Sequence, residues 1–281
     1  MTAPDVITVA HSPDADDAFM FYALAREKLD TEGLRFEHVL KDIESLNRDA
    51  LEGRYHVTAV SFHAYASLVD RYLLLPHGAS MGDRYGPMIV AAEPMAPERV
   101  AEMTVAIPGE QTTAALALRL FAPAVRTTVV PFDQIPAAVT SGTVAAGVII
   151  HESQVTYAEE GLHKVLDLGE WWDAQTGLPL PLGGNAIRRD LDPPVIRQVS
   201  RLLRASIAYA LAHREEALAH AMQFGRGLTD AQADRFVGMY VNDLTMDYGD
   251  RGRRAVQELY LRAHGAGIIP RRIPVEFVTE D

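Results

Sequence analysis

A histidine, a carboxylic acid and a hydroxyl follow one another directly after an apolar run. His151, Glu152 and Ser153 come after residues 143–150, which are mostly small and apolar. A short apolar run closed by polar residues indicates a buried parallel strand, so His151 would stand at the carboxyl end of that strand. Ligands of open α/β sheets bind at this end, and the near-neutral pKa of histidine suits proton abstraction. The alternative is a histidine that is hydrogen-bonded at the strand end for structure alone.

Two threonines stand at the start of a predicted helix. Thr112 and Thr113 follow the turn Pro108-Gly109 and precede an alanine- and leucine-rich stretch that begins at Ala114. The start of a helix presents N–H groups and the positive end of its dipole, which attract a carboxylate or a phosphate. An ordinary helix cap explains the same residues equally well.

Two further stretches place polar groups near predicted strand ends. Ser61 follows the predicted strand 57–60 and would cap the next helix. As for Thr112 and Thr113, an anion-binding helix start and an ordinary helix cap explain this residue equally well. Asp14, Asp16 and Asp17 could hold a cation through their oxygens, but acids at a helix start are also favoured by the helix dipole, which is the simpler explanation. No histidines show the spacing of a metal triad, and the chain has no cysteine, so we predict no metal.

The residues above lie within two successive αβ series, followed by a mainly helical region. Apolar runs predict the strands, and stretches with 3.6-residue periodicity or capping residues predict the helices. This alternation is typical of an α/β fold with mostly parallel sheets. The predicted strands cover residues 6–10, 34–40, 57–60, 104–107, 125–130 and 143–150, and the main predicted helices cover 15–28, 43–53, 112–121, 133–141, 195–213, 229–241 and 253–264.

Glycine and proline mark two crossings between the series, at residues 72–92 and 178–184. We therefore expect residues 1–92 and 184–281 to form a larger, discontinuous α/β lobe and residues 93–183 to form a smaller α/β lobe. The cleft between two such lobes is the default place for a ligand.

The composition narrows the class of protein. The chain has 281 residues, 48% of them hydrophobic, and a formal net charge of −12. This charge argues against a nucleic-acid partner, which would need clustered lysine and arginine. No apolar run is long enough to cross a bilayer, and the N-terminus lacks the basic and apolar regions of a secretory signal. We expect a cytoplasmic protein that acts on a small molecule and has no membrane partner.

Several motifs together resemble one enzyme family over most of the chain. Residues 147–153, with Tyr157 close behind, resemble the signature of the 1,4-dihydroxy-6-naphthoate synthase family of menaquinone biosynthesis. The motifs keep their order along the chain, so together they are far more specific than any one of them. The other matching pieces are Leu46-Asn47-Arg48, residues 50–53, Ser61 with Ala64-Tyr65-Ala66, Thr112-Thr113-Ala114, residues 176–183 and residues 209–213.

The resemblance implies a two-lobed α/β architecture, similar to type II periplasmic binding proteins, with the ligand cleft between the lobes. It implies a lyase that converts cyclic dehypoxanthine futalosine, a small anionic substrate, to 1,4-dihydroxy-6-naphthoate, with His151 as the proton acceptor. It implies neither a metal nor an organic cofactor. The residues that would hold the substrate are Thr112, Thr113 and Ala114 in one lobe and Asn47, Ala59, Val60 and Ser61 in the other, with Ala59 and Val60 acting through their backbone.

One loop departs from the family pattern, and two alternatives remain open. The family's first loop resembles Ser-Pro-Cys-Pro-Asn-Asp-Thr, whereas residues 12–18 read Ser-Pro-Asp-Ala-Asp-Asp-Ala. The loop gains negative charge where an anionic substrate would enter, which leaves the exact substrate open. The alternatives are a related enzyme such as chorismate dehydratase and a small-anion solute-binding protein without catalysis. The oligomeric state is also open, with a homodimer as one alternative.

Overall fold

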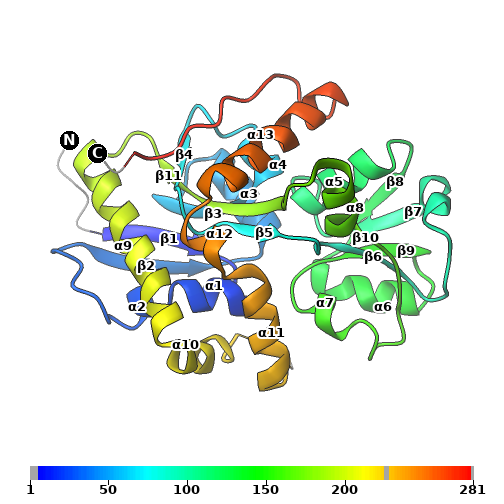
Figure 1. Ribbon diagram of the computed structural model, residues 1–281, viewed down its shortest axis with the longest axis horizontal. Helices are drawn as coiled ribbons and strands as arrows, with labels where there is room; N and C mark the ends of the chain where they lie inside the picture. Colours follow the sequence, from blue (N-terminus) through cyan, green and yellow to red (C-terminus); the bar gives the residue numbers. More distant parts are fainter. Residues whose placement is uncertain (1–5, 225–227, 280–281) are drawn as a thin grey trace. The chain divides into compact units, whose positions relative to one another are not determined.

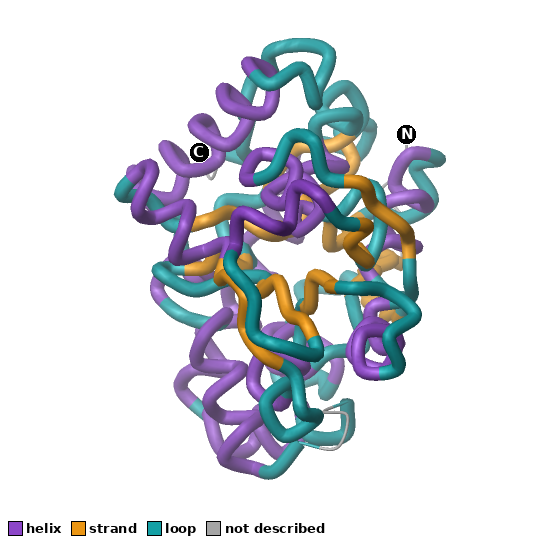
Figure 2. The backbone as a smooth tube through the Cα atoms, turned by 90° about the vertical axis from the view of Figure 1, so that its right-hand side faces the viewer, coloured by secondary structure: helices purple, strands orange, loops and turns teal. Residues whose placement is uncertain are grey.

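The structure is a computed structural model that describes residues 6–224 and 228–279. The chain divides into two compact units. Unit 1 contains the described residues of Met1–Ser80, Gly183–Asp250 and Ile273–Asp281, and unit 2 contains Met81–Leu182 and Arg251–Arg272. Figure 1 labels the elements of both units, and Figure 2 shows their strands in orange, bordered by helices in purple.

A mixed six-stranded sheet forms the centre of unit 1. Its strand order is β2-β1-β3-β11-β4, and β5 pairs with β11 beside this path. Strands β1 and β2 are parallel, as are β1 and β3, whereas β11 runs antiparallel to both β3 and β4. The strands are β1 (Val6–His11), β2 (Arg35–Leu40), β3 (Val57–Ser61), β4 (Tyr72–Leu74), β5 (Ser80–Gly82) and β11 (Leu180–Arg188).

Helices cover the apolar surfaces of this sheet. Leu46 of α3 packs against Ala10 and Ala59, which lie on neighbouring strands. Asp42 caps α3 by accepting a hydrogen bond from the backbone of Ser45, so a local sequence signal sets the start of this helix. The helices of unit 1 are α1 (Ala15–Met20), α2 (Tyr22–Ala25), α3 (Ile43–Leu51), α4 (Phe62–Tyr65), α9 (Pro193–Ala212), α10 (Arg214–Ala221), α11 (Asp230–Tyr240) and α12 (Asp243–Met246).

A mixed five-stranded sheet forms the centre of unit 2, with the order β10-β6-β9-β7-β8. Strand β7 is parallel to β8 and β9, whereas β6 is antiparallel to β9 and β10. The strands are β6 (Met88–Ala91), β7 (Thr104–Ile107), β8 (Arg126–Val129), β9 (Ala146–Ile149) and β10 (His163–Asp167), and the helices are η1 (Pro97–Glu102), α5 (Thr113–Phe121), η2 (Phe132–Gln134), α6 (Ile135–Thr140), α7 (Ser153–Thr156), α8 (Leu168–Thr176) and α13 (Gly249–Gly265).

The packing of α6 against this sheet requires a glycine. Ile135 and Val139 of α6 belong to one apolar cluster with Ile149 of β9. A Cβ atom at Gly147 would lie 2.4 Å from Cγ2 of Ile135. Glycine at this position of β9 therefore lets the helix approach the strand that leads to His151.

Two sequence predictions need correction. The predicted helix 15–28 is two short helices, because the backbone leaves helical geometry at Phe21, whose ring stacks on His11 with 4.4 Å between centroids. The sheets are mixed rather than mostly parallel. The antiparallel pairs come from β6, which lies in the first predicted crossing, and from β11, which begins in the second and extends to Arg188.

The units also differ from the predicted lobe ranges in two places. Strand β6 lies before residue 93 but pairs with β9 of unit 2. Residues 251–272 lie in unit 2, where Arg251 forms an ion pair with Asp83 at 2.7 Å and Arg262 donates a hydrogen bond to the Gln175 carbonyl at 3.2 Å. Among the described residues, no helix combines the length and apolarity that spanning a membrane requires.

Candidate active site

The strand β9 ends two residues before His151, as the sequence predicted. All four residues of β9 are buried, and His151 follows in a partly exposed turn. The backbone of His151 is left-handed, with φ of 55°, a conformation that is uncommon for residues other than glycine. Its carbonyl accepts a hydrogen bond from the backbone of Gln154 at 3.1 Å, at the start of α7. A histidine is thus presented at the carboxyl end of a central strand, where α/β sheets bind ligands.

The ring of Phe132 packs against His151, a contact that the sequence did not predict. The two ring centroids are 4.8 Å apart, and the ring planes are inclined by 68°. Phe132 follows β8, which is separated from β9 by β7 in the sheet order. Parallel strands end at the same edge of a sheet, so the carboxyl ends of β8 and β9 bring these two rings together.

Thr112 is the N-cap residue of α5. Its hydroxyl accepts a hydrogen bond from the backbone of Ala115 at 3.2 Å and donates one to the Gly109 carbonyl at 2.8 Å. The side chain of Thr112 is therefore engaged in capping, as one of the two explanations of this motif required. Thr113 and Ala114 occupy the first turn of the helix, the end at which the helix dipole favours an anion.

The hydroxyl of Thr113 donates a hydrogen bond to the Leu182 carbonyl at 2.6 Å. A hydroxyl has a single hydrogen, so this contact competes with donation to a carboxylate. We expect Thr113→Val to lower the free energy of unfolding by about 0.5–1.5 kcal/mol, because the variant keeps the side-chain shape but loses this bond. Urea denaturation measures the effect. Thr143→Val is the control, since Thr143 is exposed. Equal stability of Thr113→Val and wild type would contradict the prediction.

Asn47 and Ser61 form a reciprocal pair in unit 1. The Ser61 backbone N–H donates to Asn47 Oδ1 at 2.9 Å, and Asn47 Nδ2 donates to Ser61 Oγ at 3.1 Å. Because a backbone N–H can only donate, its partner must be the amide oxygen, and this fixes which amide atom faces the hydroxyl. Ser61 Oγ therefore accepts from Asn47, and this bond does not use the hydrogen of the serine hydroxyl. Asn47 is fully buried, and Ser61 is 3% exposed.

Ala59 and Val60 lie inside β3, next to Ser61. Their partners across the antiparallel ladder are Asn185 and Gly184 of β11. On the other side, the ladder between β3 and β1 extends only to the pair of Ala10 and Thr58. The end of β3 is therefore held from the β11 side, and its backbone beyond Thr58 is outside the β1 ladder.

The acidic loop at the carboxyl end of β1 is buried. Asp17 Oδ2 accepts a hydrogen bond from the Ser12 backbone at 2.7 Å, and the side chain of Asp14 makes no capping hydrogen bond. Burial, followed by the nearby carboxylates of Asp16 and Asp14, raises the pKa of Asp17 well above its usual range. This carboxyl group binds a proton more readily than the sequence alone suggests, so the loop adds less negative charge than a count of its acids.

The predicted residues are divided between the units. Asn47, Ala59, Val60 and Ser61 lie in unit 1, and Thr112, Thr113, Ala114 and His151 lie in unit 2. Trp172, which follows β10 in α8, is fully buried and donates a hydrogen bond to the Pro179 carbonyl at 3.1 Å. Across residues 6–224 and 228–279, no group of three or more histidine, aspartate or glutamate side chains is arranged to hold a metal ion.

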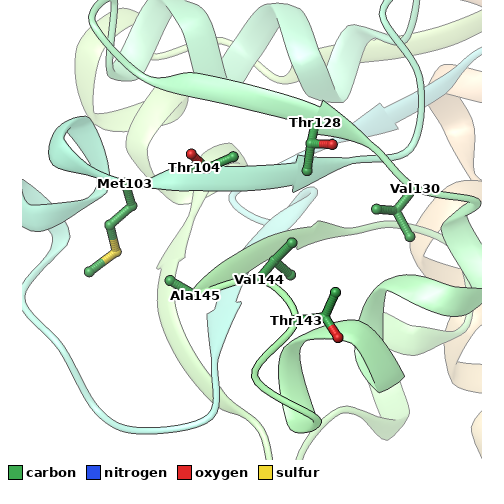
Figure 3. A pocket seen from close by; sticks show the side chains of 7 residues that line it. All are labelled: Met103, Thr104, Thr128, Val130, Thr143, Val144 and Ala145. Atoms are coloured by element: carbon green, nitrogen blue, oxygen red, sulfur yellow. The ribbon is translucent and has the colours of Figure 1, made fainter.

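A pocket of about 540 Å³ in unit 2 contains none of the predicted residues (Figure 3). Its lining is apolar or hydroxylated, without a charged side chain or a histidine, so it lacks the groups needed for proton transfer or for pairing with an anion. The lining residues are Met103, Thr104, Thr128, Val130, Thr143, Val144 and Ala145.

Comparison with known proteins identifies relatives of nearly the same length. The model of a family described as menaquinone biosynthesis matches residues 7–265. A 1,4-dihydroxy-6-naphthoate synthase from Thermus thermophilus is 42% identical over 264 residues, covering 94% of this chain and 96% of the relative. A 1,4-dihydroxy-6-naphthoate synthase from Streptomyces coelicolor is 36% identical over 272 residues, covering 95% of each chain.

Solved structures confirm the predicted fold. A crystal structure of a protein from Archaeoglobus fulgidus has a TM-score of 0.90 and 48% identity, covering 94% of this chain and 99% of that one. The alkanesulfonate-binding protein from Xanthomonas axonopodis pv. citri has a TM-score of 0.74 over 98% of each chain, but only 13% identity, so it shows the fold alone. The fold is therefore that of periplasmic binding proteins, and the chain belongs to the menaquinone biosynthesis family.

Proposed function

We propose that the protein is a 1,4-dihydroxy-6-naphthoate synthase, a carbon–carbon lyase that converts cyclic dehypoxanthine futalosine to 1,4-dihydroxy-6-naphthoate. The observation that carries this proposal is the similarity to two synthases over at least 94% of the chain. The test is to incubate the purified protein with cyclic dehypoxanthine futalosine and to follow naphthoate formation. A protein that binds the compound without turning it over would instead be a solute-binding protein on the same fold.

His151 is the proposed general base of this reaction. Proton abstraction next to a carbonyl requires a base whose pKa lies near the working pH, and histidine meets this requirement. Its place after the buried strand β9 and its partial exposure support the role, because a base must be both held in position and reachable by substrate.

Ser61 is the proposed donor to an anionic group of the substrate. Since Ser61 Oγ accepts a hydrogen bond from Asn47 at 3.1 Å, the serine hydrogen remains available for donation. The first-turn N–H groups of Thr113 and Ala114 are proposed to bind an anionic group as well, by attraction to the helix start. In this proposal Asn47 orients the serine rather than touching the substrate.

We expect Ser61→Ala to raise KM with little change in kcat, because it removes one hydrogen bond to a charged group. Such a bond is worth about 1.5–3 kcal/mol, which corresponds to roughly a 10–150-fold change in affinity. Steady-state kinetics with cyclic dehypoxanthine futalosine measure it. Ser141→Ala is the matched control, since Ser141 is an exposed serine of unit 2. An unchanged KM in Ser61→Ala would remove Ser61 from the substrate-binding residues.

We also propose that the enzyme works in the cytoplasm. This rests on the family's role in a biosynthetic pathway and on the composition of the chain. Fractionation of cells that produce the protein, followed by detection with an antibody, tests it.

A further inference from the structure

The turn that carries His151 has a constrained backbone. Its φ of 55° lies in the left-handed region, where a residue with a Cβ atom is strained. Such a conformation persists only where the surrounding structure imposes it. Strand β9 precedes the turn by one residue, and α7 begins two residues after His151. The next residue, Glu152, is buried, with 5% of its surface exposed.

With the backbone held, the orientation of the imidazole is set by its two side-chain torsion angles. The Phe132 ring, 4.8 Å away and inclined by 68°, occupies one side of the space that rotation about these bonds needs. Phe132 reaches His151 from a separate segment, the short helix η2 that follows β8. The ring offers an apolar surface and no proton donor or acceptor, so it can restrict the imidazole without competing for the proton.

We propose that Phe132 is a positioning residue, which holds the His151 imidazole in the orientation that proton abstraction requires. This inference rests on the proposed function, in which His151 is the general base. Phe132 acts through His151 and takes no part in proton transfer. An apolar residue that orients the base should affect the chemical step more than substrate binding, because the base acts in the transition state.

The test compares Phe132→Leu, Phe132→Tyr and Phe121→Leu with wild type. Phe132→Leu keeps an apolar side chain but removes the ring, and Phe132→Tyr restores the ring. Phe121→Leu is the matched control, because Phe121 is also in unit 2 and packs its ring on Trp171 at 5.6 Å. We expect kcat to fall on the order of 10–100-fold in Phe132→Leu with KM little changed, since small misplacements of a reacting group cost this much. Phe132→Tyr and Phe121→Leu should keep the wild-type kcat.

A second measurement does not depend on turnover. The ring protons of His151 are assigned by NMR from the signals that disappear in His151→Asn. We expect them to lose their ring-current shift and to show averaging over several orientations in Phe132→Leu, but not in Phe132→Tyr. A purely structural role for Phe132 would lower stability without this change.

The outcomes separate the inference from the proposed function. If His151→Asn is inactive and Phe132→Leu has the wild-type kcat, the positioning role is overturned and the general base stands. If wild type forms no naphthoate, the proposed function fails, and unchanged His151 signals in Phe132→Leu would then overturn the contact on which the inference depends. If His151→Asn keeps full turnover, both the base and its positioning are wrong.

Discussion

In His151→Asn, we expect kcat to fall by about 10²–10⁴-fold, the usual contribution of general acid–base catalysis. Asparagine keeps a polar side chain of similar reach but cannot accept the substrate proton. KM should change little, because the base acts on the transition state more than on the bound substrate. In wild type, the rate should rise with pH as the imidazole loses its proton, since only the neutral form can take another.

The measurement is steady-state kinetics of naphthoate formation across a range of pH. His163→Asn is the matched control, because His163 is also in unit 2 and is exposed at the start of β10. It should keep wild-type kinetics. Turnover at the wild-type rate in His151→Asn would end the mechanism proposed here, and a loss of affinity alone would point to a binding role for this histidine.

The free energy of unfolding should fall as the pH is lowered from about 6.5 to about 4. Burial, followed by the neighbouring His38, lowers the pKa of His11 to about 3. Burial lowers the pKa of His38 and of His77 to about 4. In the unfolded chain these groups bind protons near pH 6.5, whereas in the folded protein they stay neutral until about pH 4. The unfolded state therefore binds more protons in this window, and stability that is present above it is lost as the pH falls.

The expected slope follows from the number of protons. Each such histidine contributes a slope of up to about 1.4 kcal/mol per pH unit. In the middle of the window, the three histidines together contribute a slope of about 4 kcal/mol per pH unit. Two carboxyl groups act in the opposite direction, because burial raises the pKa of Asp17 well above its usual range and that of Asp167 to about 6. They bind protons more readily in the folded protein and offset part of the loss.

A substitution at His38 isolates one of these protons. His11 Nδ1 donates to the Ser12 carbonyl at 3.0 Å, so in the neutral pair His11 Nε2 accepts from His38 Nδ1 at 3.1 Å. The amide of asparagine can supply the same donor without titrating. His38→Asn should therefore reduce the slope of unfolding free energy against pH by up to about 1.4 kcal/mol per unit. Urea denaturation at several pH values measures it. A slope in His38→Asn that is identical to the wild-type slope would refute the assignment.

The sequence by itself determined the features that depend on neighbouring residues. The strand over Thr104–Ile107 was predicted with its observed bounds, because the run is too short for a helix and is closed by the turn Pro108-Gly109. Thr112 and Thr229 were recognised as helix starts, since a capping hydrogen bond reaches only three residues along the chain. His151 was placed at a strand end because it directly follows a short apolar run.

Only the tertiary structure decided which of these residues meet. Asn47 and Ser61 are 14 residues apart, and their reciprocal hydrogen bonds depend on how α3 packs on β3. The contact of Phe132 with His151 depends on the order of β8, β7 and β9 in the sheet. Residues 251–272 belong to unit 2, where Arg251 and Arg262 contact the distant residues Asp83 and Gln175. Periodicity and capping act over a few residues, whereas these contacts are set by sheet order and by the burial of side chains from separate segments, which no local pattern contains.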